Sequence, residues 1–508
     1  MPAARSLAEA YHRLTKYTEA NVRSARALDW SSQPKPFKEI VSRRRVPLRG
    51  YLPFARDPFT GESITRAPDP PEGGFGLPEI SRLLFFANGV TGMVQFEGGG
   101  GQPLRAAPSA GALYPTETYV AVRDLPGLDP GVYNYQVHTH ELVGLWEGDY
   151  LDGIRDACGG PDVFAGCRAC VLLTGIFLRS AWRYQERGYR RVLLDTGHVL
   201  GNLVAFAPHE RAAAVPVAGF RDAALNGLFF LDESVEGVLA CAPLLAEVTE
   251  CVPEPLLASA TTRAGRLAAV RIDAEEDLAR SATIALHRGS ACVEAARPPA
   301  AAGAIDPPTR RAVALERGVD LEARVPEAIL RRRSARAYAD GRITREQLGT
   351  CLGFALGRGD AHGAGRPVRF ATREAGILQA RLVAVGVEGV DPGVYEVEGA
   401  GEALAPFALG DFRRELFHLS LEQEIAGRCA AALAFVASSR EAIARWGDRA
   451  YRYLHLDAGH AGERLQLAAS ALGLGACGVA GFLDDEAASL LGIEPDDFTL
   501  YLVTVGPS

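Results

Sequence analysis

The sequence has little that would place the protein in a membrane or in an oxidising compartment. It contains no run of about 18 consecutive apolar residues, the length that a membrane-spanning helix needs. Residues 1–20 are polar and carry no apolar core of a secretory signal, and the nine cysteines among 508 residues are too few for a disulfide scaffold. We therefore expect a cytoplasmic protein.

An excess of positive charge is also missing. The 54 Lys and Arg residues against 62 Asp and Glu residues leave a formal net charge of −8, which argues against a nucleic-acid partner. Cys167 and Cys170 form a CxxC pair, but no second pair completes a four-cysteine zinc site, so the sequence predicts two buried cysteines and no metal. A hydrophobic fraction of 48% predicts packed globular domains rather than a disordered chain.

What the sequence does contain is a long internal repeat. Asp129–Tyr133 (DPGVY) returns 262 positions later as Asp391–Tyr395. The same offset relates a second set of residues: Tyr189, Arg190, Asp195, Gly197 and His198 return as Tyr451, Arg452, Asp457, Gly459 and His460. One offset kept over about a hundred residues predicts a tandem duplication, and a unit this long predicts two equivalent domains that pair within the chain.

Composition marks where the two copies join. Residues 295–309 are rich in Pro and Ala, which is typical of a connector. Each copy has an apolar helix, two strands joined by the Asp-Pro-Gly turn, an apolar strand and a long helix, without regular βαβ units, so we expect an α+β fold. The predicted boundaries are an N-terminal extension over 1–34, a first domain over 35–255, a linker over 256–319 and a second domain over 320–508.

Several motifs have both a functional and a structural interpretation. Arg331–Arg336 (RRRSAR) offers guanidinium and hydroxyl donors that suit a phosphate, but a solvated basic run has the same composition. Arg105–Pro115 (RAAPSAGALYP) is a loop of small residues that could lie against a flat ligand or simply connect two elements. Gly473–Gly478 (GLGACG) fits the dinucleotide pattern GxGxxG, but an apolar helix precedes it where that pattern needs a strand. It therefore predicts a helix end and a close backbone approach. His198 and His460 lie in apolar helices without a second ligand one turn away, which favours core histidines.

Together these segments resemble those of the nitroreductase superfamily of flavin enzymes, and more closely those of the SagB-type dehydrogenases, the thiazoline and oxazoline oxidases of modified-peptide biosynthesis. In the first copy the resemblance rests on YHRLTKY (11–17), LDW (28–30), QPKPFK (33–38), PSAGALYP (108–115), LDPGVYNY (128–135) and YRRVLLDTGH (189–198). In the second copy it rests on RRSAR (332–336), YRYLHLDAGH (451–460), ALGLGACGVAGF (471–482) and the last strand. The resemblance implies two tandem α+β domains that form a pseudo-dimer with FMN at their interface.

The resemblance also implies which residues hold the FMN. The phosphate is expected at Arg332, Ser334 and Arg336, near the start of the second domain. The flavin is expected against a Gly-rich stretch of the second domain, Gly478, Val479, Ala480 and Gly481, and against a Pro–Ser loop of the first domain, Pro108, Ser109, Ala110 and Gly111. These residues predict one intact composite site, built from both domains.

The reciprocal site is expected to be lost, because each of its parts has changed. Ala371 and Arg373 stand at the two key positions of the Pro–Ser loop in the second copy. Arg211–Pro216 (RAAAVP) stands in place of the Gly-rich stretch, and Arg43–Pro47 (RRRVP) in place of the phosphate segment, with valine instead of serine. We therefore expect one FMN per chain.

A Lys-Tyr pair shortly before the Tyr-Arg motif is a further implication of the resemblance, with the roles of base and proton-handling partner. Here the pair is Arg183 with Tyr184 in the first copy and Arg445 with Trp446 in the second, and either could face the flavin. Arginine stays protonated and is a poor base. Tyr184, with Arg183 beside it, is therefore the candidate for proton exchange.

The predicted function is that of an FMN-dependent oxidoreductase of the SagB type, which oxidises a peptide- or carrier-bound azoline by hydride transfer to flavin. One alternative is an NAD(P)H-dependent nitro or quinone reductase with the same cofactor. Another is an inactive scaffold subunit of a biosynthetic complex. The expected partners are a small-molecule or peptide substrate and biosynthetic proteins, with no nucleic acid and no membrane. The chain is expected to be a monomeric pseudo-dimer or a homodimer of it.

Overall fold

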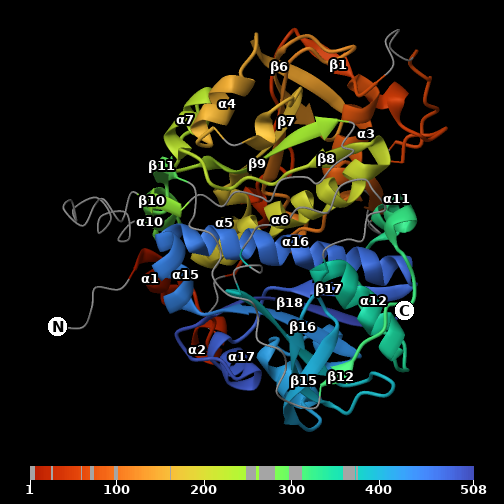
Figure 1. Ribbon diagram of the computed structural model, residues 1–508, viewed down its shortest axis with the longest axis vertical. Helices are drawn as coiled ribbons and strands as arrows, with labels where there is room; N and C mark the ends of the chain where they lie inside the picture. Colours follow the sequence, from red (N-terminus) through yellow and green to blue (C-terminus); the bar gives the residue numbers. More distant parts are fainter. Residues whose placement is uncertain are drawn as a thin grey trace.

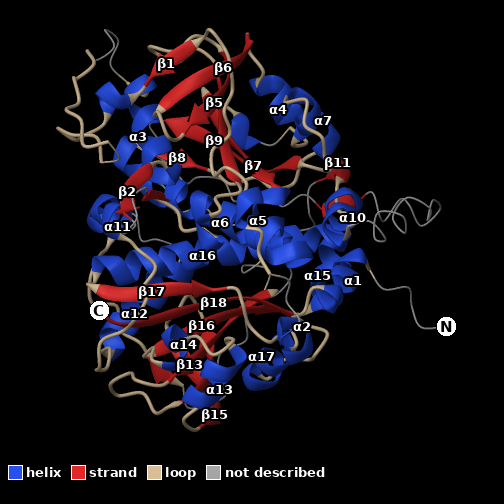
Figure 2. Ribbon diagram, turned by 180° about the vertical axis from the view of Figure 1, so that it is seen from behind, coloured by secondary structure: helices blue, strands red, loops and turns tan. Residues whose placement is uncertain are grey.

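Two β-sheets lie towards opposite ends of the molecule, with a layer of helices between them (Figure 1, Figure 2). The computed structural model describes residues 6–23, 27–58, 60–68, 74–95, 101–160, 162–246, 259–262, 281–296, 312–357, 372 and 376–508. Apolar side chains form a central buried cluster between the sheets and a further cluster on the outer face of each sheet. Each sheet is therefore covered on both faces.

The two sheets have the same strand order, and neighbouring strands are antiparallel. The first sheet has the order β1-β6-β5-β4-β7-β9-β8, with β1 (Arg45–Pro47), β4 (Thr116–Val122), β5 (Gly131–Gln136), β6 (Glu141–Glu147), β7 (Ala169–Ile176), β8 (Ala212–Ala214) and β9 (Glu236–Ala246). The second has the order β12-β15-β14-β13-β16-β18-β17, with β12 (Val313–Ala314), β13 (Leu378–Ala384), β14 (Gly393–Glu398), β15 (Ala403–Leu409), β16 (Ala431–Ala437), β17 (Leu474–Val479) and β18 (Phe498–Pro507). From β4 onward each strand of the first sheet begins 262 positions before its counterpart. The predicted tandem duplication and the α+β class are thus confirmed.

The helices follow the same repeat. The paired helices are α3 (Leu77–Asn88) with α12 (Arg345–Leu356), α4 (Leu151–Ala157) with α13 (Arg413–Leu419), α5 (Phe177–Tyr184) with α15 (Ser439–Trp446), α6 (Gly188–Phe206) with α16 (Ala450–Ala471), and α7 (Asp222–Leu228) with α17 (Asp484–Leu491). The other helices are α1 (Leu7–Leu14), α2 (Glu19–Arg23), α10 (Ala282–Gly289), α11 (Val325–Arg331) and α14 (Glu424–Gly427). Two small two-stranded sheets pair β2 (Val90–Gln95) with β3 (Gly101–Arg105) and β10 (Ser259–Thr262) with β11 (Cys292–Ala296). Local signals set several helix ends. For example, Thr344 Oγ1 accepts a hydrogen bond from the N–H of Gln347 at 3.0 Å in a capping box that begins α12.

The long helices α6 and α16 pack against each other at the centre of the molecule, and glycine makes their close contact possible (Figure 1). A Cβ atom on Gly197 would overlap the carbonyl oxygen of Leu456 and lie 2.9 Å from the Cα atom of Gly459. A Cβ atom on Gly459 would in turn overlap the carbonyl oxygen of Leu194. The repeated Gly-His motif contains glycine because two helix backbones touch there.

Arginines at the start of each long helix reach into the other domain. Nη1 of Arg187 and Nη1 of Arg190 bind the carboxylate of Asp484 at 2.5 and 2.7 Å. These three side chains are at most 3% exposed, so one carboxylate compensates two buried cations. The equivalent residues of the other half, Arg449, Arg452 and Asp222, pair in the same way at 2.5 and 2.6 Å. These two Arg–Asp clusters join the domains.

The N-terminal helix α1 packs against the second domain. Nδ1 of His12 lies 3.1 Å from the hydroxyl of Tyr451. Helix α10 makes the equivalent contact with the first domain, where Nδ1 of His287 lies 2.9 Å from the hydroxyl of Tyr189. Serine caps both helices, and a parallel bridge follows each, Tyr17 with Leu483 after α1 and Cys292 with Arg221 after α10. The two copies therefore exchange their N-terminal helices.

The prediction that residues 256–319 are only a linker is wrong, because part of this segment is the exchanged N-terminal helix of the second copy. Residues 281–292 are the structural counterpart of residues 6–17, and they belong to the second copy rather than to a connector. Their offset is 275 positions instead of 262, so a search at one constant offset does not find them. The boundaries 35–255 and 320–508 of the two domains remain predictions.

The cysteines have a structural place in the core. All eight within the described residues are free and buried, which confirms the prediction for Cys167 and Cys170. Among the described residues, no group of three His, Cys, Asp or Glu side chains is arranged to hold a metal ion. None of the helices in the described ranges combines the length and the apolar character that a membrane crossing requires.

Candidate functional site

The arginine-rich segment 332–336 runs beside strand β17. The backbone N–H of Ala335 donates to the carbonyl oxygen of Ala476 at 2.8 Å, and Ser334 forms a parallel bridge with Ala476. Ser334 is half-buried and Arg336 is exposed. The predicted phosphate segment thus lies next to the predicted Gly-rich stretch of the same domain.

Arg332 reaches from the second domain to the first. Its Nε donates to the carbonyl oxygen of Ala106 at 3.1 Å, and its Nη2 donates to that of Arg105 at 3.4 Å. Oε1 of Glu463 on α16 lies 3.6 Å from the same Nε. The Arg332 side chain is 5% exposed, and its Nη1 has no hydrogen-bond partner within the described part of the chain. The two domains meet at this guanidinium, which keeps one buried donor for a further acceptor.

The Pro–Ser loop is anchored on α6 through Ser109. Its Oγ donates to Oδ2 of Asp195 at 2.6 Å and accepts from the N–H of Tyr114 at 2.9 Å. Burial raises the pKa of Asp195 to about 7, although the hydrogen bond from Ser109 lowers it. Gly111 has a φ of +63°, in the left-handed region, which explains a glycine at this position. The hydroxyl expected beside the flavin is therefore engaged in shaping the loop.

His198 links the Pro–Ser loop to the second domain. Its Nδ1 lies 3.2 Å from the carbonyl oxygen of Pro108, and its Nε2 lies 3.1 Å from the hydroxyl of Tyr501 on β18. Burial lowers the pKa of His198 to about 3, so the ring is neutral at physiological pH. Because the Pro108 carbonyl can only accept, Nδ1 is the donor and Nε2 accepts from Tyr501. The prediction of core histidines is confirmed, since His460 is also buried.

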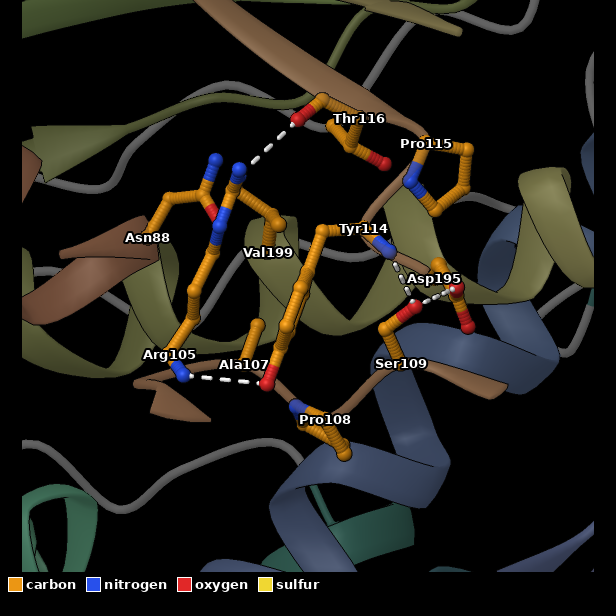
Figure 3. Close-up of a pocket in the computed structure, with 10 residues that line it drawn as sticks. All are labelled: Asn88, Arg105, Ala107, Pro108, Ser109, Tyr114, Pro115, Thr116, Asp195 and Val199. Atoms are coloured by element: carbon orange, nitrogen blue, oxygen red, sulfur yellow. Dashed lines mark hydrogen bonds between the residues drawn. The ribbon is translucent and has the colours of Figure 1, made fainter. Parts of the chain in front are cut away.

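A small polar cavity lies behind the Pro–Ser loop (Figure 3). Its volume of about 10 Å³ is far below the roughly 300–1,000 Å³ of typical ligand pockets. One wall is the guanidinium of Arg105, whose pKa burial lowers to about 10, with the ring of Tyr114 at 4.7 Å. The cavity is too small for a flavin nucleotide.

Side chains surround two glycines of the Gly-rich stretch to different degrees. A Cβ atom on Gly478 would overlap the hydroxyl of Tyr501, so a larger residue there would displace that tyrosine. A Cβ atom on Gly481 would be in ordinary contact with Leu421 and Arg191, at 3.5 and 3.7 Å. Packing therefore excludes a larger residue at Gly478, while Gly481 has Arg191 of the first domain beside it.

Arg183 and Tyr184 end helix α5 against the Pro–Ser loop. A Cβ atom on Gly111 would lie 2.9 Å from Oη of Tyr184 and 3.3 Å from Cδ of Arg183. The guanidinium carbon of Arg191 lies 3.8 Å from the centre of the Tyr184 ring, and its Nη2 donates to the carbonyl oxygen of Ala480 at 3.4 Å. The structure therefore brings this pair together with both halves of the predicted composite site.

The counterpart pair in the second domain has a different place. Trp446 is 2% exposed and belongs to the central core, where its ring lies edge-on to that of Tyr453 with a centre-to-centre distance of 6.1 Å. The guanidinium of Arg445 lies over the Trp446 ring at 5.4 Å. The pair that reaches the composite site is therefore the one from the first domain.

Comparison with known proteins agrees with this architecture. The family model described as Nitroreductase family matches residues 78–243 and again residues 329–507. This chain is a member of the nitroreductase family. It is a nitroreductase-type oxidoreductase in which two family domains follow one another in a single chain.

Three relatives of this nitroreductase illustrate the match. A solved structure from Anabaena variabilis, described as a nitroreductase, is 32% identical with a TM-score of 0.85 and covers 99% of this chain and 100% of its own. A protein of Methanocaldococcus jannaschii named as a nitroreductase is 31% identical over 157 residues, 31% of this chain and 75% of that protein. The trifolitoxin-processing protein TfxB of Rhizobium leguminosarum is 34% identical over 185 residues, 34% of this chain and 48% of TfxB. The chain thus spans about half the length of TfxB.

The prediction that Arg43–Pro47 is the altered phosphate segment of the first domain is wrong. These residues lead into β1, which pairs with β6 as β12 pairs with β15, so their counterpart in this nitroreductase is Val313–Ala314. Arg45 pairs there with Glu141 at 2.9 Å. The true counterpart of Arg332–Arg336 lies between β1 and α3, where no Arg-x-Ser-x-Arg sequence occurs. The reciprocal segment is therefore changed more than the sequence comparison assumed.

The other two parts of the reciprocal site have different outcomes. Strand β8 lies beside β9 as β17 lies beside β18, which confirms that Arg211–Pro216 stands where the second domain has Gly473–Gly478. Arg211 has a φ of +53° where Gly473 has +71°, an uncommon conformation for a residue with a side chain. Ala371 and Arg373 lie outside the described residues.

Sequence reasoning missed several residues that lie at the predicted composite site. Tyr17, from the N-terminal segment, has its ring 4.2 Å from the guanidinium carbon of Arg187 and 5.7 Å from that of Arg191. Tyr501 was seen only as part of the last strand. The sequence held one signal for Arg191. The Tyr-Arg motif just before it is the same in both copies, but the residue equivalent to Arg191 in the second copy is Tyr453, so this position differs between the copies.

Proposed function

We propose that one FMN per chain binds between the two domains of this nitroreductase. Arg332, Ser334 and Arg336 would hold the phosphate, because two guanidinium groups and a hydroxyl supply charge-assisted hydrogen bonds. The backbone of Gly478–Gly481 from the second domain and that of Pro108–Gly111 from the first would lie along the flavin. Bound FMN would supply the capacity to accept a hydride.

The observation that carries this proposal is the buried Nη1 of Arg332. A buried donor without an acceptor is costly, and a phosphate oxygen would satisfy it. The same guanidinium touches the segment that leads into the Pro–Ser loop, so both halves of the site converge on it.

For the reaction we infer a SagB-type dehydrogenation. A peptide- or carrier-bound azoline would lose a hydride to the flavin and a proton to a base, and become the azole. Oη of Tyr184, beside Gly111, is placed to take up or pass on the proton, while Arg183 keeps a positive charge next to it. The likeness to TfxB, named for trifolitoxin processing, supports a role in the maturation of a biosynthetic product.

A second candidate is NAD(P)H-dependent reduction of a nitro or quinone compound. Arginine at position 183, where the SagB type has lysine, favours it because arginine is a poor base. The relatives from Anabaena and Methanocaldococcus are both described as nitroreductases. In this case the flavin would pass electrons from the nicotinamide to the substrate.

The test of the cofactor proposal is the amount of FMN released from denatured protein. We expect about one FMN per chain and a yellow protein. Arg332→Ala removes charge-assisted hydrogen bonds and should weaken FMN binding by about 10- to 100-fold, and Ser109→Arg should block the loop. Arg44→Ala, in the basic run of the first domain, is the matched control and should leave binding unchanged. Two FMN per chain would contradict the single site, and none after adding FMN would leave the scaffold alternative.

The test of the reaction uses the loaded protein with two probes. A short peptide that bears one thiazoline should become the thiazole in the presence of oxygen, and its arrival should bleach the flavin under anaerobic conditions. Bleaching by NADPH alone, with no change of the peptide, would favour the second candidate and contradict the azoline reaction.

A further inference from the structure

Arg191 connects Tyr184 with the Gly-rich stretch of the other domain. Its guanidinium carbon lies 3.8 Å from the centre of the Tyr184 ring, and its Nη2 donates to the carbonyl oxygen of Ala480 at 3.4 Å. The Arg191 side chain is 3% exposed, and the ring of Tyr17 lies 5.7 Å from it. A buried guanidinium over an aromatic face is attracted by the ring and holds its orientation.

The duplication supplies an internal comparison for this contact. The positions 262 residues later hold Trp446 for Tyr184 and Tyr453 for Arg191, two buried rings with centres 6.1 Å apart. The arginines that bind Asp484 are, in contrast, present in both copies. The fold thus accepts an apolar pair at these two positions, so folding alone does not require the Arg–Tyr pair.

The difference between the copies follows the composite site. In the first domain the polar pair places a hydroxyl beside Gly111, at the loop that the proposed site uses. In the second domain the same two positions hold the buried rings of Trp446 and Tyr453, on the side where Arg211–Pro216 stands in place of Gly473–Gly478. The polar Arg–Tyr pair therefore lies at the intact site, and the packed aromatic pair lies at the changed one.

We propose that Arg191 is a positioning residue that holds the Tyr184 hydroxyl beside Gly111, where the substrate exchanges its proton. The proposal rests on the proposed function, since it assigns Tyr184 to that exchange. Tyr184 is the last residue of α5 and is half-buried, so its ring has room to turn away when the guanidinium is removed. Arg191 acts through Tyr184 and through the Ala480 carbonyl, not on the substrate itself.

The experiment compares FMN-loaded full-length variants with the thiazoline peptide as substrate. Arg191→Met removes the charge, Arg191→Lys keeps it, Tyr184→Phe removes the hydroxyl, and a double variant combines the first and third changes. Loss of a buried cation–π contact should lower kcat about tenfold with KM nearly unchanged. Because Arg191 works through Tyr184, the double variant should be no slower than Tyr184→Phe alone. Tyr453→Phe, at the equivalent position of the other domain, is the matched control and should have no effect.

Fluorescence of the bound FMN gives a readout that does not depend on turnover. An adjacent phenol quenches flavin fluorescence by electron transfer, so Tyr184→Phe should raise it. Arg191→Met should raise it by most of the same amount, Arg191→Lys by less, and the double variant no further. If Arg191→Met raises the fluorescence only when Tyr184 is present, the result would support the positioning role. Additive losses in the double variant, or unchanged fluorescence in Arg191→Met, would overturn it.

Further measurements distinguish a failure of the Arg191 proposal from a failure of the proposed FMN site. The exchange Tyr184→Trp with Arg191→Tyr copies the pair that the second domain already accommodates, so it should fold and bind FMN but lose turnover. If Arg191→Met loses its FMN while Tyr184→Phe keeps it, then Arg191 holds the cofactor and the positioning role is overturned. A wild-type protein that takes up no FMN would overturn the proposed function itself, which is visible before any variant is made.

Discussion

A buried carboxyl group lies where the two domains meet. Glu463 on α16 is fully buried, and neither of its carboxylate oxygens has a hydrogen-bond partner in the described parts of the chain. Its nearest cation is Arg332, at 3.6 Å from Nε to Oε1. Burial raises the pKa of Glu463 to about 8, although the positive charge of Arg332 lowers it in part. The carboxyl is therefore protonated at neutral pH, and Arg332 keeps its charge for another anion.

This pKa predicts how stability depends on pH. Below about pH 4 the carboxyl is protonated in both states and contributes nothing. Between that value and pH 8 the unfolded chain releases the proton and the folded one keeps it, so Glu463 lowers the free energy of unfolding by up to about 1.4 kcal/mol per pH unit. Glu463→Gln should therefore be more stable than the wild type at pH 9, and its advantage should shrink to about 1 kcal/mol at pH 5, as measured by urea unfolding of the FMN-free protein. The exposed Glu415→Gln is the control, and a parallel shift at both pH values would contradict the assignment.

At the scale of elements, the contact between α6 and α16 sets how the two domains are joined. Backbone touches backbone there, since a Cβ atom on Gly459 would overlap the carbonyl oxygen of Leu194 and lie 3.0 Å from its carbon. Neither group is the flexible end of a side chain, so the helices themselves would have to separate. The contact tolerates nothing larger than glycine.

Gly459→Ala should accordingly destabilise the protein strongly, although alanine is the better helix former. Overpacking between two backbones should lower the free energy of unfolding by about 3 kcal/mol or more. Gly227→Ala in α7, where an added Cβ meets nothing within 4 Å, is the matched control and should be neutral or gain up to about 1 kcal/mol. Urea unfolding measures both. Equal stabilities of the two variants would show that the helices can separate without cost.

Helices and strands with a clear run of apolar residues could be predicted from the sequence. Short strands that form only by pairing with a distant strand could not. The apolar strand expected in each copy is present as β7 and β16, and the apolar helix as α3 and α12. Strand β1, by contrast, has three residues, and its basic neighbours suggested a phosphate segment. Its identity as an edge strand depends on pairing with β6, about a hundred residues away, which no local pattern records.

At the scale of the whole molecule, the duplication made part of the candidate site predictable. The two copies lose different parts, so comparing them indicated that the Pro–Ser loop of one domain and the Arg-rich segment of the other belong together. Arg332 does reach the segment that leads into that loop. The comparison could not predict Tyr17, which reaches the site because the copies exchange their N-terminal helices. That exchange depends on tertiary packing and changes the repeat offset, so a fixed offset conceals it.

The two Arg–Asp clusters that join the domains allow a last prediction with an internal control. Asp484→Asn and Asp222→Asn each leave two buried arginines without a carboxylate, which should lower the free energy of unfolding by about 3–5 kcal/mol. The clusters differ in what lies beside them. Arg187, held by Asp484, also donates from Nη2 to the carbonyl oxygen of Ala480 in the Gly-rich stretch, at 3.4 Å. The equivalent carbonyl of Ala218, bound by Arg449 at 2.6 Å, lies in the half where Arg211–Pro216 stands in place of Gly473–Gly478.

Both variants should therefore lose similar stability in urea unfolding, while FMN titration of the folded proteins should separate them. Asp484→Asn frees Arg187 from its carboxylate, shifts the carbonyl of Ala480 and should weaken FMN binding, whereas Asp222→Asn should bind FMN as the wild type does. Equal weakening in both variants would mean that FMN affinity follows overall stability rather than one side of the interface. Weakening confined to Asp222→Asn would place the flavin in the other half of the molecule and contradict the composite site. The matched pair thus tests, on the full-length chain, whether a nearly symmetric interface supports a binding site on one side only.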